Sequence, residues 1–109
     1  LLFECPFIFR TWEFVFKILQ NTKSWKCIIL GIPDNIIHNN VISIVQFLLY
    51  KKFQIDNNRG DNNIENLYTF LVRELGKQIC ILENIDRNES QVVSIYLREI
   101  METITKMLV

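Results

Sequence analysis

The 109-residue sequence contains few of the residues that interrupt regular structure and few of those that build catalytic or metal sites. Three glycines and two prolines are too few for a loop-dominated or disordered chain. The three cysteines are widely spaced without a CxxC pair, which argues against a disulfide framework and favours a reducing, intracellular compartment, cytoplasm or nucleus. The single histidine, His38, has no serine, cysteine or carboxylate at a spacing typical of a catalytic base. We therefore predict that the chain is not an enzyme.

Net charge and a long apolar run are also absent. Twelve basic side chains balance twelve acidic ones, so the strongly basic character typical of a nucleic-acid-binding domain is missing. Residues 1–60 carry seven basic and four acidic side chains (net +3), and residues 61–109 carry five and eight (net −3). Solvated helix faces commonly produce such an imbalance. The longest charge-free stretch, residues 35–50, contains several polar side chains and is shorter than the ~20 apolar residues of a bilayer span. We expect a soluble chain without a membrane partner.

Apolar side chains recur at helical spacing in four segments of the chain, and this periodicity predicts four α-helices. Each segment begins with a proline or with a polar residue suited to the first turn of a helix. The predicted starts are Pro6, Asp34 or Asn35, Asn62 with Glu65 as a capping box, and Asn88 with Gln91. The predicted boundaries between helices are Asn21 to Thr22 and the polar turns 57–61 and 86–88.

The apolar stripes of these helices make up the predicted core, because residues three and four positions apart share one face of a helix. The stripes are Ile8, Trp12, Val15 and Leu19; Ile37, Val41, Ile44, Val45, Leu48 and Ile55; Ile64, Leu67, Leu71, Leu75 and Ile79; and Val93, Tyr96, Leu97, Ile100, Ile104 and Leu108. Cys27 and Cys80 stand beside isoleucines, and we expect both to be small core residues.

A brief apolar run, residues 25–30, is too short for periodicity to distinguish a strand from a buried helical turn. Gly31 and Pro33 close this run. We favour a helical turn, because an isolated strand between helices would leave its backbone groups unpaired. The predicted fold is therefore all-α, a small bundle of four main helices plus a short helical turn, in a single helical domain or fragment over residues 1–109.

The first predicted helix carries more aromatic side chains than one buried face requires. Phe9, Phe14 and Phe16 lie largely off its apolar stripe. A helix that is apolar on more than one side is either central to a core or covered by a partner. This surplus favours one hypothesis for function, a helical protein–protein interaction module without enzymatic activity, with self-association as one form of the interaction.

A second feature combines aromatic and basic side chains at the end of the second predicted helix. The segment Tyr50-Lys51-Lys52-Phe53 has the ingredients for base stacking and phosphate contact on single-stranded nucleic acid. The alternative interpretation is structural, with Phe53 in or near the core and both lysines solvated at a helix end.

The start of the chain, LLFECPF over residues 1–7 followed by Trp12, resembles the closing half of the zinc-binding motif found after the polymerase domain in LINE-type, non-LTR retrotransposon reverse transcriptases. In that family a CxxC pair and a histidine complete a Cys-Cys-His-Cys set. The resemblance implies that Cys5 is the last metal ligand and that the other ligands precede Leu1. A structural zinc site normally needs four ligands, so we expect no cofactor here unless those upstream ligands are present.

Further segments are similar to the same family at the level of pattern, namely residues 25–31, residues 45–52 and the final helices. The resemblance implies that residues 1–22 are the end of a zinc-motif-like segment with the first helix, and that residues 23–109 are a helical tail. It implies a non-catalytic C-terminal fragment of a reverse transcriptase, whose partner in the parent is the upstream polymerase domain. A first residue other than methionine agrees with a fragment. Weak contact with RNA or DNA is then expected through Arg10, Lys17, Lys23, Lys26, Lys51 and Lys52.

Overall fold

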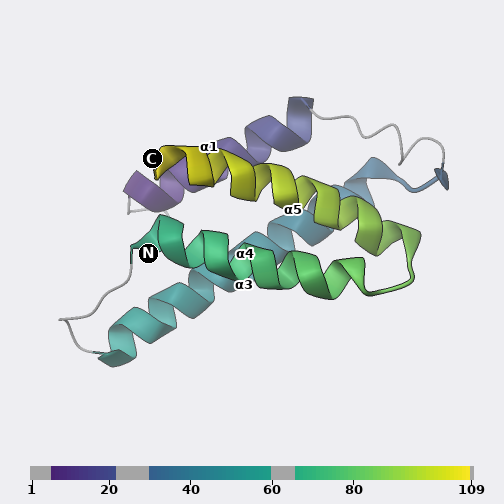
Figure 1. Cartoon of the computed structure of the whole chain (residues 1–109). Helices are drawn as coiled ribbons and strands as arrows, with labels where there is room; N and C mark the ends of the chain where they lie inside the picture. Colours follow the sequence, from purple (N-terminus) through teal and green to yellow (C-terminus); the bar gives the residue numbers. More distant parts are fainter. Residues whose placement is uncertain (1–5, 22–29, 60–65, 109) are drawn as a thin grey trace.

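The computed structural model describes residues 6–21, 30–59 and 66–108, which contain four α-helices and no strand. The helices are α1 (Pro6–Asn21), α3 (Asp34–Arg59), α4 (Leu67–Glu83) and α5 (Asn88–Met107). Helices α4 and α5 form an antiparallel hairpin, α1 crosses α5 obliquely and packs against it, and α3 crosses behind the hairpin and extends past its end (Figure 1). The predicted all-α bundle is confirmed. The short helical turn and the subdivision at residue 22 both fall mainly on residues 22–29, outside the described residues.

The starts of α1 and α3 agree with the sequence prediction. Helix α1 begins at Pro6, where the missing N–H of proline leaves no hydrogen bond unmade. Helix α3 begins just after Pro33, and the N–H of Ile36 donates to the Pro33 carbonyl oxygen over 3.2 Å. Gly31 precedes this start with a φ of +70°, a backbone conformation that glycine adopts without steric cost.

One hydrophobic core joins the four helices. Its buried members are Trp12, Val15 and Leu19 of α1; Ile37, Val41, Val45, Leu48 and Leu49 of α3; Tyr68, Phe70, Leu71, Leu75 and Ile79 of α4; and Val92, Val93, Tyr96, Leu97, Ile100 and Ile104 of α5. The predicted stripes supply most of this set. Ile8, Ile44, Ile55 and Leu67 are partly buried against it.

Two predicted core residues lie in solvent instead. Cys80 is exposed on α4, because it follows the buried Ile79 by about 100° around the helix and so points to another face. Leu108 is also exposed, because α5 ends at Met107 and its stripe ends with it. Cys27 and Ile64 lie outside the described residues.

The cap of α4 differs from the predicted capping box. Within the described residues α4 begins at Leu67, and Asn66 occupies the N-cap position. The Asn66 Oδ1 atom accepts a hydrogen bond from the N–H of Tyr68 over 2.8 Å, which satisfies one of the free donors of the first turn. Asn62 and Glu65 lie outside the described residues.

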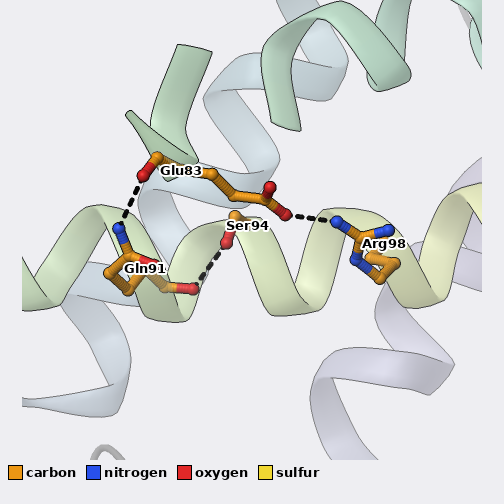
Figure 2. A network of polar contacts seen from close by, with 4 residues as sticks. All are labelled: Glu83, Gln91, Ser94 and Arg98. Atoms are coloured by element: carbon orange, nitrogen blue, oxygen red, sulfur yellow. Dashed lines mark hydrogen bonds and ion pairs between the residues drawn. The ribbon is translucent and has the colours of Figure 1, made fainter. Parts of the chain in front are cut away.

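The turn between α4 and α5 is held by a side chain that the sequence analysis assigned to a cap. Gln91 donates from Nε2 to the carbonyl oxygens of Glu83 and Ile85, over 3.1 and 3.2 Å. Asn88 is already helical, and the N-cap residue Arg87 makes no side-chain capping bond. Figure 2 shows Gln91 reaching from α5 to Glu83 at the end of α4. The amide of Gln91 therefore satisfies carbonyls left free where α4 ends.

A second link joins the same two helices. The guanidinium of Arg98, two turns along α5 from Gln91, pairs with the carboxylate of Glu83 (Figure 2). Ser94 lies between them and donates to the Gln91 carbonyl oxygen over 2.7 Å. The α4–α5 hairpin is thus closed at its turn by hydrogen bonds and by one exposed ion pair.

Candidate interaction surface

The two lysines of the aromatic and basic segment of α3 lie in different environments. Lys51 is exposed, whereas Lys52 is only 6% exposed and its Nζ lies 2.7 Å from Asp56 Oδ1. The prediction that both are solvated is therefore wrong for Lys52. Lys52 follows Val41 by eleven residues and so continues the buried stripe of α3. Its aliphatic stem is covered while Asp56 satisfies its ammonium group.

Lys51 forms an ion pair with a carboxylate of α4. Glu74 of α4 is 3% exposed, and its two oxygens lie 2.6 Å from Lys51 Nζ and 3.0 Å from Lys77 Nζ. The hydrogen bonds from Lys51 and Lys77 lower the pKa of Glu74, although burial acts in the opposite direction. Glu74 follows the buried Phe70 by four residues, and that spacing was the available signal for its burial.

The outward face of α1 gathers both aromatic and charged side chains. We define the α1 outer surface as Phe9, Arg10, Glu13, Phe16 and Lys17, all of them exposed. Phe9 is 55% exposed and Phe16 is 46% exposed. The opposite face of the same helix is already buried in the core. The predicted aromatic surplus of this helix is therefore confirmed for Phe9 and Phe16.

The other aromatic side chains of α1 near this surface are Phe14 and Trp12. Phe14, the third member of the predicted surplus, is partly buried against the core and does not belong to the outer surface. Phe16 stacks on the buried Trp12, with ring centroids 5.7 Å apart and an interplanar angle of 27°. This contact covers part of the Phe16 ring, and the rest of the side chain remains exposed.

The charges of the α1 outer surface have no partner within the part of the chain that the structure describes. Arg10, Glu13 and Lys17 make no hydrogen bond or ion pair with the described residues. Arg10 and Lys17 are thus the two predicted nucleic-acid contacts that combine exposure with an uncommitted cation. Lys23, Lys26 and Cys5 lie outside the described residues.

Helix α3 presents a second exposed face of different chemistry. We define the α3 outer surface as Ile36, Ser43, Phe47, Tyr50 and Gln54, which are all exposed and uncharged. Phe47 is 55% exposed and Tyr50 is 53% exposed. These side chains lie opposite the buried stripe of the helix. Aromatic exposure therefore occurs on two helices, once with charges of both signs and once without any charge.

A small hollow of about 230 Å³ lies where α3 meets the start of α5. Its floor is apolar, with Ile44, Leu82 and Val93, and across its rim Asn40 Nδ2 donates to Glu89 Oε1 over 3.2 Å. This volume is below the ~300–1,000 Å³ of typical small-molecule sites. His38 does not line this hollow; it is half-buried, with its ring edge-on to Tyr96.

The described residues contain neither a metal-binding group of side chains nor a helix that could cross a membrane. Among residues 6–21, 30–59 and 66–108, no three or more histidine, cysteine, aspartate or glutamate side chains gather at metal-binding distance. None of the helices in those ranges has the length and apolar content to cross a membrane. The α1 outer surface is the strongest candidate site on the described residues.

Comparison of the chain with protein-family models, with curated proteins and with solved structures finds no match.

Proposed function

We propose that this chain is a non-catalytic helical interaction module that binds a protein partner through the α1 outer surface. The observation that carries the proposal is the exposure of Phe9 and Phe16 on a helix whose other face already lies in the core. Complete burial of a phenylalanine side chain contributes about 1.5–3 kcal/mol. A partner that covers both rings would gain a substantial part of that free energy.

The resemblance to LINE-type reverse transcriptases supplies the proposed origin of this module. In that interpretation the chain is a C-terminal helical region whose parent is an RNA-directed DNA polymerase with its catalytic carboxylates upstream. The proposal assigns this chain no catalytic residue and no cofactor of its own. The polymerase domain of such a parent is one protein that the α1 outer surface could meet.

A photocrosslinking experiment tests the proposal at a single side chain. Phe9 is replaced by photoreactive benzoylphenylalanine, and a matched variant carries the same group in place of Phe47 on α3. We expect ultraviolet irradiation of cells that express the chain to yield a discrete protein adduct from position 9 and none from position 47. Absence of any protein adduct from position 9, or equal adducts from both positions, would count against the proposal. The adduct mass and its peptides identify the partner.

A second candidate function, weak contact with single-stranded RNA or DNA, has its own supporting observation. Arg10 and Lys17 lie seven residues apart, about 10 Å along α1, and each stands next to an exposed phenylalanine. Lys52 is left out of this surface because its ammonium is buried against Asp56, and Lys51 is committed to Glu74. Two phosphate contacts predict a slope of about −1.4 for the logarithm of affinity against the logarithm of salt concentration on single strands.

Fluorescence anisotropy with a labelled oligonucleotide at low salt measures that contact. We expect the double variant Arg10→Ala with Lys17→Ala to lose most of the binding and Lys106→Ala, an exposed cation on α5, to keep it. Equal losses in the two variants would show that the contact is not specific to α1. No binding by the unmodified chain at low salt would remove this candidate.

A further inference from the structure

We propose that the partner of the α1 outer surface is a second copy of this chain, bound by antiparallel pairing of the two α1 helices across a two-fold axis. This inference rests on the proposed function of that surface and names its occupant. The argument comes from the order of aromatic, acidic and basic side chains along α1, which matches itself when one copy is reversed.

The α1 outer surface consists of two flanks with one acidic residue between them. Seven residues correspond to almost two turns of an α-helix, so Phe9 and Phe16 lie one above the other on an aromatic flank. Arg10 and Lys17 lie one above the other on a basic flank by the same spacing. Glu13 lies between the flanks, one turn from Arg10.

A two-fold axis brings like flanks together and reverses their order. In an antiparallel pair of helices the axis is perpendicular to both, so the aromatic flanks of the two copies lie on the same side. Phe9 of each copy then lies beside Phe16 of the other, which allows the aromatic pairs that proteins favour. The axis for this pairing crosses the outer face of α1 at the height of Trp12 along the helix.

The charged side chains require an axis within one residue, about 1.5 Å, of the same position. When Glu13 of one copy faces Arg10 of the other, the point midway between the two residues also lies next to Trp12. One axis therefore creates two aromatic contacts and two ion pairs at once. Parallel pairing would instead place the basic flank of one copy against the aromatic flank of the other and Glu13 against Glu13, where like charges repel. Charge complementarity thus selects a reversed second copy as the partner.

The size of the matched surface predicts a weak dimer. A buried aromatic side chain contributes about 150–250 Å², and the four phenylalanines of the pair are already about half covered. The interface falls at the low end of specific protein–protein interfaces, which extend below ~1,200 Å² for transient contacts. We therefore expect a reversible equilibrium between monomer and dimer rather than a permanent assembly.

Sedimentation equilibrium of the purified 109-residue chain over a wide concentration range tests the pairing. We expect the double variant Phe9→Ala with Phe16→Ala to raise the dissociation constant about tenfold or more. The matched control is Phe47→Ala with Tyr50→Ala, which removes two equally exposed rings from α3 and should leave the constant unchanged. Circular dichroism establishes that both variants keep their helices. A dimer that depends on the α3 pair instead would overturn the inference.

A charge exchange separates this dimer from non-specific aromatic association. We expect R10E and E13R each to weaken self-association, and the double variant R10E/E13R to restore it, because the ion pairs are reformed with opposite polarity. A mixture of the R10E and E13R chains should form a mixed dimer in preference to either homodimer. If the double variant stays as weak as the single ones, the proposed antiparallel pairing is wrong.

The crosslink at position 9 distinguishes failure of this inference from failure of the proposed function. A monomer at every concentration with an adduct to a different protein would overturn the second copy as occupant while the protein-binding function stands. A monomer without any adduct would overturn both. An adduct to RNA or DNA alone would also overturn both, in favour of the nucleic-acid candidate. An adduct of twice the chain mass, joined through α1 peptides, is the expected result.

Discussion

The α4–α5 hairpin and the pair α1 and α3 use their aromatic side chains in opposite ways. The aromatic residues of the hairpin, Tyr68, Phe70 and Tyr96, are all buried. Helices α1 and α3 bury Trp12 but leave five aromatic side chains exposed: Phe7, Phe9, Phe16, Phe47 and Tyr50. The hairpin also has polar links between its own helices, made by Gln91 and Arg98. The other two helices help to cover the hairpin rings, through contacts of Phe7 with Tyr68 and of His38 with Tyr96. Aromatic side chains of the hairpin are therefore buried where helices meet, whereas the five exposed ones all lie on α1 and α3.

The largest expected effect comes from the same truncation made in each region. Phe70→Ala on α4 removes a ring that is 2% exposed and should lower the free energy of unfolding by about 3–5 kcal/mol through lost burial and a cavity. Phe47→Ala on α3 removes an exposed ring and should change it by no more than about 0.5 kcal/mol. Urea denaturation followed by circular dichroism measures both. Similar losses in the two variants would break the comparison.

The next effect concerns Glu74, which connects α4 of the hairpin to α3. Because its pKa is lowered in the folded state, its ionised form stabilises the fold above the unfolded pKa, and this contribution is lost as pH falls through the lowered folded value. Glu74→Gln should cost about 1–2 kcal/mol at neutral pH and should flatten the loss of stability below pH ~4.5. Denaturation at a series of pH values measures this. An unchanged acid limb in the variant would show that Glu74 is not the group responsible.

A smaller loss is expected from the cap of α4. Asn66→Ala removes the acceptor of the Tyr68 N–H and should lower the free energy of unfolding by about 1 kcal/mol. Asn66→Asp keeps an acceptor at the same position and is the matched control. Hydrogen exchange of the first-turn amides measures the local effect. Equal protection in Asn66→Ala and the unmodified chain would mean that the hairpin does not rely on this cap.

The smallest effect is expected from the ion pair at the hairpin surface. Arg98 and Glu83 are each more than 40% exposed, and exposed pairs contribute about 0–1 kcal/mol. Arg98→Ala should therefore lower the thermal midpoint only slightly, and added salt should reduce the difference. A loss as large as that of Phe70→Ala would show that the surface ion pair stabilises the hairpin as much as a buried ring does.

Much of the fold could be predicted because helix signals are local. Pro6 and the Pro33-Asp34 pair mark helix starts that the structure keeps, and the apolar stripes recur within a few residues of one another. The sequence predicts the cap of α4 at Asn62, whereas the N-cap of α4 is Asn66, because asparagine suits that position at either site. Gln91 was assigned to its own helix start, whereas its amide serves the carbonyls of α4. A capping partner on a neighbouring helix cannot be recognised from sequence spacing alone.

The candidate site was predicted in part. Phe9, Phe16, Arg10 and Lys17 were singled out from the sequence, and all four are exposed. Lys52 was singled out as well, yet its position on the buried stripe of α3 removes it from the surface. Residue type favoured solvent for this lysine, and helix periodicity favoured the core. The neighbouring Asp56 allowed burial to prevail by satisfying the ammonium group.

The sequence by itself determined that the chain forms helices and which stripe of each helix is apolar, because both depend on spacings of three and four residues along one segment. Only the tertiary structure decided which apolar side chains outside these stripes remain exposed to solvent. Phe9 and Phe70 are the same residue type on similar helices, yet one is exposed and the other is closed over by neighbouring helices. Burial depends on which face of a helix meets another helix, and that meeting is a property of the packed chain rather than of any segment.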